Sequence, residues 1–202
     1  MPVRIMIAED QTMVRQALVA LLELEPDIEV VAEAADGSEA LAMARRHQPD
    51  VAVLDIEMPG PNGIEVAGQL RQSGFGGKVV IVTTFDRPGY LRAAMAAGAT
   101  GFLLKYAPAA DLAAAIRRVA AGERVVDPSL AAAALAEGDS PLTEREAEVL
   151  AAAAGHDAIA DIAGRLHLSG GTVRNHLSAA IQKLGARNRA EAVAIAQQKG
   201  WL

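Results

Sequence analysis

The sequence predicts an α/β domain with a doubly wound, five-stranded parallel sheet, followed by a small all-α domain. Short apolar runs rich in β-branched residues alternate five times with helical patterns, and after Gly122 only helical patterns recur. Near-continuous apolar strands separated by helices are typical of a parallel sheet covered on both faces. An all-helical chain is the alternative, because alanine dominates the apolar residues, but short β-branched runs argue against it.

The elements of the first domain, residues 1–122, follow in order. Strands are expected at 3–8, 29–34, 50–54, 78–82 and 101–104. Helices are expected at 12–24, 37–47, 63–73, 87–97 and 108–121. Each apolar run ends at acids, Thr, Gly or Lys, which fixes the strand ends.

Residues 123–139 carry Pro, Gly and Ser around one short alanine-rich segment, and we expect a linker there. The second domain, residues 140–202, is expected to hold four helices, at 143–153, 158–166, 171–184 and 189–199. Thr143 and Glu146 match a capping box, in which the Thr side chain caps the helix and the Glu side chain reaches back.

Composition excludes several classes of protein. The chain has 202 residues and a net charge of -6, which argues against a protein that coats nucleic acid through a generally basic surface. It has no cysteine, which excludes a disulfide scaffold, thiol catalysis and cysteine-ligated zinc. Two acids occur by residue 10, which does not fit a signal peptide, and no apolar stretch is long enough to span a membrane. We therefore expect a cytoplasmic protein that does not insert into membranes.

Chemistry is expected at the carboxyl ends of the strands, where open parallel sheets bind ligands. Glu9 and Asp10 follow the first strand, Asp55 the third, Thr83 the fourth and Lys105 the fifth. Each alone has an ordinary explanation as a cap or solvated strand end. Together, three carboxylates suit Mg²⁺, while a hydroxyl and an ammonium suit phosphoryl oxygens. The constellation predicts a phosphoacceptor site, with Asp55 as nucleophile forming an acyl phosphate.

Residues 1–122 resemble the receiver domain of bacterial two-component response regulators. The matching strings are IAEDQ (7–11), VLDIEMPGPNGIE (53–65), VTTF (82–85) and GATGFLLK (98–105). The resemblance implies a flavodoxin-like fold and phosphorylation by a sensor histidine kinase. It also implies roles: Glu9, Asp10, Asp55 and the Glu57 carbonyl hold Mg²⁺, Asp55 is phosphorylated, Thr83 and Phe102 switch, and Lys105 pairs with phosphate. Tyr106 departs from the Asp that relatives often have.

The second domain contains a helix-turn-helix pattern, in which 171–184 would be the helix that enters the major groove of DNA. Ser169 is its expected N-cap, and Val173, Leu177, Ile181 and Leu184 should face the core. Residues 162–190 contain no acid but include Arg165, Arg174, Lys183, Arg187 and Arg189, a basic stripe that suits phosphates. An ordinary amphipathic helix with solvated polar residues is the alternative.

Residues 141–202 resemble the LuxR/NarL-type DNA-binding domain through LTEREAEVL, GTVRNHLS and LGARNRAEA. This resemblance implies that Arg174, Asn175 and Ser178 face the groove, that Thr172, Lys183, Arg187 and Arg189 lie near phosphates, and that the last helix dimerises. Residues 155–168 depart from the family because they are less basic. The strings IAEDQ, DIEMPG, TTFDRPGY and SGGTVRNHLS are most similar to the DesR branch, which controls lipid desaturation.

We therefore expect a phosphorylation-activated dimeric transcription factor that binds double-stranded promoter DNA and is not an enzyme. An interaction module and a small Mg²⁺-dependent hydrolase are the alternatives. Receiver dimerisation is expected through apolar residues of the first and fifth helices, some of which must cover the sheet, or through 87–97 with the fifth strand. The candidate apolar residues are Met13, Val14, Ala17, Leu18, Leu112, Ala113, Ile116 and Val119.

Overall fold

Six parallel strands form one sheet in the order β2-β1-β3-β4-β5-β6. The computed structural model describes residues 1–84, 88–136, 140–155 and 157–202. The strands are β1 (Val3–Ala8), β2 (Ile28–Ala34), β3 (Val51–Asp55), β4 (Lys78–Thr83), β5 (Gly101–Leu104) and β6 (Val125–Val126). The expected α/β class is confirmed, but the expected count of five strands is wrong by one.

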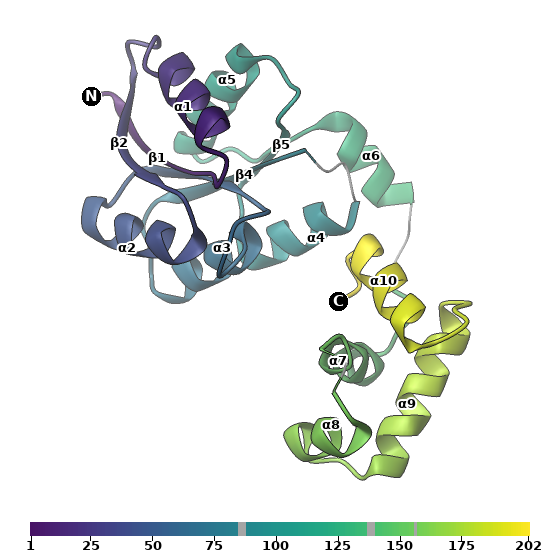
Figure 1. Cartoon of the computed structure of the whole chain (residues 1–202). Coiled ribbons are helices and arrows are strands. Elements are labelled where there is room, and N and C mark those ends of the chain that lie inside the picture. The colour runs from purple at the N-terminus through teal and green to yellow at the C-terminus, as the bar shows by residue number, and fades with distance from the viewer. Residues whose placement is uncertain (85–87, 137–139, 156) are drawn as a thin grey trace. The chain divides into compact units, whose positions relative to one another are not determined.

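Helices cover both faces of this sheet, as a doubly wound fold requires. They are α1 (Thr12–Leu22), α2 (Gly37–His47), α3 (Gly63–Gln72), α4 (Pro88–Ala97) and α5 (Ala109–Ala120). Figure 1 shows α1 and α5 on one face, with α2 and α3 on the other. The expected helix 87–97 begins at a residue outside the described ranges.

The larger apolar residues of α5 pack into the core between that helix and the sheet. Leu112, Ala113, Ile116 and Val119 are buried together with Ile7 and other strand residues. The expectation that some of the eight candidate apolar residues cover the sheet is therefore confirmed for these four, because their spacing places them on the sheet-facing side of the helix.

The additional strand, β6, comes from the expected linker 123–139. Its backbone pairs with β5, and the Asp127 N–H donates to the Phe102 carbonyl at 3.2 Å. Asp127 then caps α6 (Pro128–Ala136) by accepting from the Ser129 N–H at 2.9 Å, and Leu130 is buried. Compact unit one accordingly extends to Ala131. Residues 137–139 of the expected linker lie outside the described residues.

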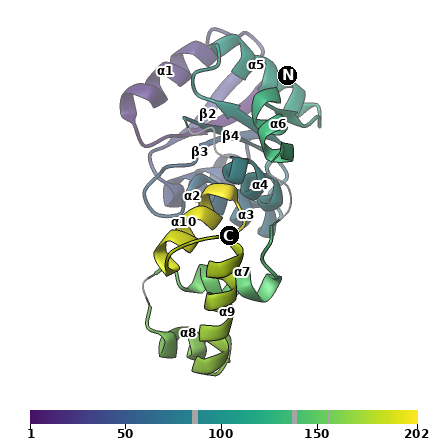
Figure 2. The same ribbon diagram turned by 90° about the vertical axis from the view of Figure 1, so that its right-hand side faces the viewer.

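Four helices lie wholly within the second unit: α7 (Glu144–Ala152), α8 (Ile159–Leu166), α9 (Gly170–Lys183) and α10 (Arg189–Lys199). Figure 2 labels all four. The capping box of Thr143 and Glu146 is present as expected. The α9 residues Val173 and Leu177 are buried in a core shared with the other three helices. In the described parts of the chain, no helix is long and apolar enough to cross a membrane.

Candidate functional site

Carboxylates gather where β1 and β3 end, beside each other in the sheet. Strand order reverses between these two strands, which is the position where open α/β sheets bind ligands. Glu9, Asp10 and Asp55 each offer a carboxylate oxygen within 4.8 Å of the others. Glu9 and Asp55 are buried, whereas Asp10 is exposed. The site is therefore a cluster of three carboxylates, of which two are buried and one faces solvent.

Lys105, which follows β5, places its ammonium against this carboxylate cluster. Its Nζ lies 2.6 Å from Glu9 Oε2 and 3.1 Å from Asp55 Oδ2. Apart from this ammonium, Glu9 Oε2 has no hydrogen-bond partner within the described residues. Three carboxylates against one ammonium leave an excess of negative charge, and a divalent cation that prefers oxygen ligands would neutralise it. These residues fit Mg²⁺.

Burial and the contacts with Lys105 act in opposite directions on the pKa values of the three groups in contact. Loss of solvation raises the pKa of Glu9 and of Asp55, although the Lys105 ammonium acts in the opposite direction on both. Burial by itself would lower the pKa of Lys105, but hydrogen bonds and charge from the two carboxylates outweigh it and raise that pKa. The lysine therefore stays charged, while the carboxylates hold protons more readily than exposed ones.

The remaining predicted site residues of this domain differ in burial. Thr83 ends β4 and is fully buried, and its carbonyl accepts from the Lys105 N–H at 2.8 Å. Phe102 on β5 is also fully buried. The Glu57 side chain is exposed and is not among the clustered carboxylates, so its predicted role would use the backbone carbonyl alone.

Two residues near the carboxylate cluster were not predicted from the sequence. Gly63, the first residue of α3, allows the chain to pass over Asp55, because an added Cβ would lie 2.0 Å from the Asp55 carbonyl oxygen. Arg15 of α1 donates to the Glu9 carbonyl oxygen at 2.6 Å. The VLDIEMPGPNGIE string contains the glycine, but no local pattern marks the arginine.

In the second unit, α8 and α9 form the predicted helix-turn-helix. His167 ends α8 in the left-handed conformation with φ 53°, and Ser169 caps α9 by accepting from the Thr172 N–H at 3.1 Å. Arg174, Asn175 and Ser178 are exposed along α9, on the side away from the buried residues. This arrangement presents one arginine, one amide and one hydroxyl to a ligand.

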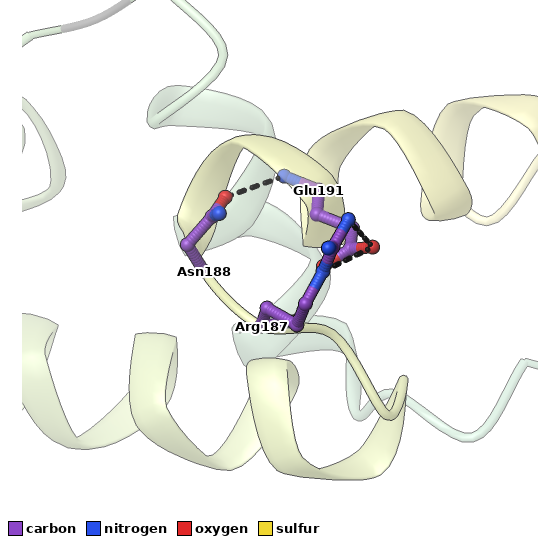
Figure 3. Close-up of polar contacts among 3 residues, drawn as sticks. All are labelled: Arg187, Asn188 and Glu191. Carbon is purple, nitrogen blue, oxygen red and sulfur yellow. Dashed lines mark hydrogen bonds and ion pairs between the residues drawn. The ribbon is translucent and has the colours of Figure 1, made fainter.

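The basic stripe is largely engaged with acids that lie outside it. Lys183 Nζ lies 2.6 Å from the buried Glu146, and Arg165 pairs with Asp157 at 2.7 Å. The Arg187 guanidinium donates three hydrogen bonds to the Glu191 carboxylate, and the Glu191 N–H donates to the Asn188 side chain (Figure 3).

Arg189 donates to the Asp157 carbonyl at 2.9 Å. Within the described residues, Arg165, Lys183 and Arg187 are paired with acids, whereas Arg174 and Arg189 have no ion-pair partner. The stripe is therefore much less positive than the count of arginine and lysine indicates.

Comparisons with known proteins agree with both halves of this geometry. Residues 5–117 match the response regulator receiver domain, and residues 140–196 match the bacterial regulatory proteins of the luxR family. The chain is 48% identical over 200 residues, covering 99% of it, to the whole of the uncharacterized transcriptional regulatory protein YvfU of Bacillus subtilis.

The transcriptional regulatory protein DesR of Bacillus subtilis is 45% identical over 98% of each chain. Among solved structures, the response regulator ChrA of a heme-sensing two-component system matches all of this chain and 99% of its own with a TM-score of 0.60 and 36% identity.

Proposed function

The chain belongs to the two-component response regulators that join a receiver domain to a LuxR-type DNA-binding domain, and from this membership we propose that phosphorylation of Asp55 controls its binding to promoter DNA. The observation that carries the proposal is the contact of Lys105 with both Glu9 and Asp55 beside Asp10. We propose the domain limits as 1–122 for the receiver, 123–139 for the linker and 140–202 for the DNA-binding domain, with β6 and the start of α6 as the part of the linker that packs on the receiver.

Asp55 is the proposed acceptor because this carboxylate, at the end of β3, contacts Lys105 and is clustered with both Glu9 and Asp10. A carboxylate oxygen of Asp55 forms a bond to phosphorus while the bond from phosphorus to the kinase histidine nitrogen breaks, and that nitrogen keeps the electron pair. Lys105 can then leave Glu9 and pair with a phosphoryl oxygen.

Mg²⁺, held by Glu9, Asp10, Asp55 and the Glu57 carbonyl, would supply positive charge to the transferring group. Thr83 and Phe102 are the proposed switch residues. A phosphoryl group brings about two negative charges and strong acceptors, to which the Thr83 hydroxyl would donate.

DNA binding is proposed for α9. The exposed Arg174 and Asn175 have the donor patterns that pair with guanine and adenine in the major groove, and Ser178 follows them along the helix. Thr172, Lys183, Arg187 and Arg189 are proposed phosphate contacts. The last three must share their donors with protein acceptors, so we expect a shallow dependence of affinity on salt for a single domain.

Dimerisation after phosphorylation is proposed to use α1. The exposed residues Met13, Ala17 and Leu21 recur every four positions along this helix, and the exposed Leu24 follows in the turn after it. Leu18, by contrast, packs against the core. The other predicted face involves β5, whose Gly101 and Phe102 are already paired with β6, so α1 is the better candidate.

Asp55→Asn tests the proposal. With acetyl phosphate and Mg²⁺, the native protein should gain one phosphoryl group by intact mass, and its affinity for a two-half-site promoter fragment should rise. The Asn variant should do neither. Asp50→Asn is the matched control, because Asp50 accepts from the Arg4 N–H at the opposite end of β3. Phosphorylation of the Asp55 variant at the native level would contradict the assignment.

Target genes are a separate proposal. The resemblance of several strings to the DesR branch leads us to propose membrane-lipid desaturation genes among the targets. Mapping of bound genomic fragments tests this, and binding confined to promoters of unrelated genes would contradict it.

A further inference from the structure

Arg15 of α1 reaches back to the backbone that carries two of the clustered acids. Its Nη1 donates to the Glu9 carbonyl oxygen at 2.6 Å, and its Nε lies 3.3 Å from Glu33 Oε2 on β2. The side chain is only 15% exposed. The planar guanidinium can hold two acceptors in fixed directions, which a lysine ammonium cannot do.

The place of Arg15 in its helix needs an explanation beyond helix formation. It lies four residues into α1, near the positive end of the helix dipole, where a cation is unfavourable. α1 has no side-chain N-cap and no acid in its first turn to offset this charge. The contacts with the Glu9 carbonyl and the Glu33 carboxylate provide the compensation.

These contacts fix the peptide that joins Glu9 to Asp10. The Glu9 N–H donates to the Ala34 carbonyl at 3.0 Å, and its carbonyl accepts from Arg15. The Gln11 N–H donates to Glu9 Oε1 at 3.2 Å. Both backbone groups of Glu9 are therefore held, and the carbonyl belongs to the same peptide unit as the Asp10 nitrogen. The direction of the exposed Asp10 carboxylate depends on that unit.

We propose that Arg15 is a positioning residue for Mg²⁺, holding the Glu9–Asp10 peptide so that both carboxylates face one ion. This inference rests on the Mg²⁺ site of the proposed function. Charge and positioning predict opposite effects of removing Arg15. Loss of a nearby positive charge should by itself tighten binding of a cation, whereas loss of the clamp should weaken it.

The experiment is calorimetric titration of the full chain with MgCl₂, together with thermal unfolding without Mg²⁺. Arg15→Gln should weaken Mg²⁺ binding by roughly tenfold, at the lower end of the effect of residues that orient metal ligands. Arg15→Lys keeps the charge but not the two-acceptor geometry, and should also weaken binding, though less. Glu33→Gln keeps an acceptor for Nε and should change affinity least.

Arg117→Gln is the matched control. Arg117 of α5 also pairs with two acids, Glu25 and Asp27, but these lie in the loop before β2, at the opposite end of the strands from the site. It should lower thermal stability and leave Mg²⁺ affinity unchanged.

A folded Arg15→Gln protein that binds Mg²⁺ as tightly as the native protein, or more tightly, overturns the positioning role. Asp10→Ala separates the two proposals. If this change leaves Mg²⁺ affinity unchanged, the proposed metal site is wrong. If Asp10→Ala weakens Mg²⁺ binding but Arg15→Gln does not, only the proposed role of Arg15 is wrong.

Discussion

Gly63→Ala should displace Asp55, because Gly63 packs directly against the Asp55 backbone. A Cβ at this position would lie 2.0 Å from the Asp55 carbonyl oxygen and 2.8 Å from the carbonyl carbon. Both contacts are with backbone, so the start of α3 and the end of β3 must separate by about 1 Å in a close-packed interior. Overpacking of this kind costs ~1–3 kcal/mol, and each kcal/mol lowers the melting temperature by ~2–4 °C for a chain of this length.

Gly68→Ala in the same helix is the control, and its expected effect on stability is opposite in sign. The nearest atom to its added Cβ is the Ala97 Cβ at 4.0 Å, an ordinary contact. Replacing a helical glycine by alanine should then stabilise the protein by ~1 kcal/mol.

Differential scanning calorimetry and the rate of phosphorylation by acetyl phosphate measure both variants. We expect Gly63→Ala to melt several degrees lower and to be phosphorylated more slowly, because Asp55 moves. If Gly63→Ala matches the native protein in both assays, the crowding argument is refuted.

Three further predictions concern charge. Because burial raises the pKa of Glu9 and Asp55, Mg²⁺ affinity measured by calorimetry should begin to fall on acidification at a higher pH than exposed carboxylates would give. The same shifts mean that the folded state favours the protonated acids, so stabilisation is present at low pH and is lost as the pH rises through the raised pKa values. Asp55→Asn should therefore melt higher than the native protein at pH 7 without Mg²⁺, with a gain that disappears in acid; an equal gain at all pH values would contradict this. Arg174→Ala should reduce discrimination between specific and random DNA by ~1–3 kcal/mol, whereas Lys183→Ala should weaken both evenly and also lower thermal stability, because the buried Glu146 loses its partner; binding titrations on both DNAs, with melting curves, separate the two outcomes.

Most of the sheet was predictable because five of its strands coincide with short apolar runs in the sequence. β1 and β5 begin and end at the predicted residues, and the other predicted strands differ by a residue or so at their ends. β6 was missed because Val125–Val126 is too short to form a pattern. Its pairing with Gly101 and Phe102 is set by a contact distant in sequence.

Side-chain partners were harder to predict than elements. The acid-free run of the second domain is real, but Lys183 finds its partner at Glu146, 37 positions earlier. Similarly, Arg15 meets Glu33 across two elements. A sequence shows the charge of a segment, whereas neutralisation depends on which helices and strands the fold brings side by side.

The pairing of β6 with β5 has a practical consequence for dividing the chain. A fragment ending at Gly122 would leave the outer edge of β5 without hydrogen-bond partners beside Phe102, and would remove the buried Leu130 side chain from the first unit. Open strand edges pair readily with other chains. We expect such a fragment to aggregate on concentration, whereas one ending after α6 should remain monodisperse in light scattering.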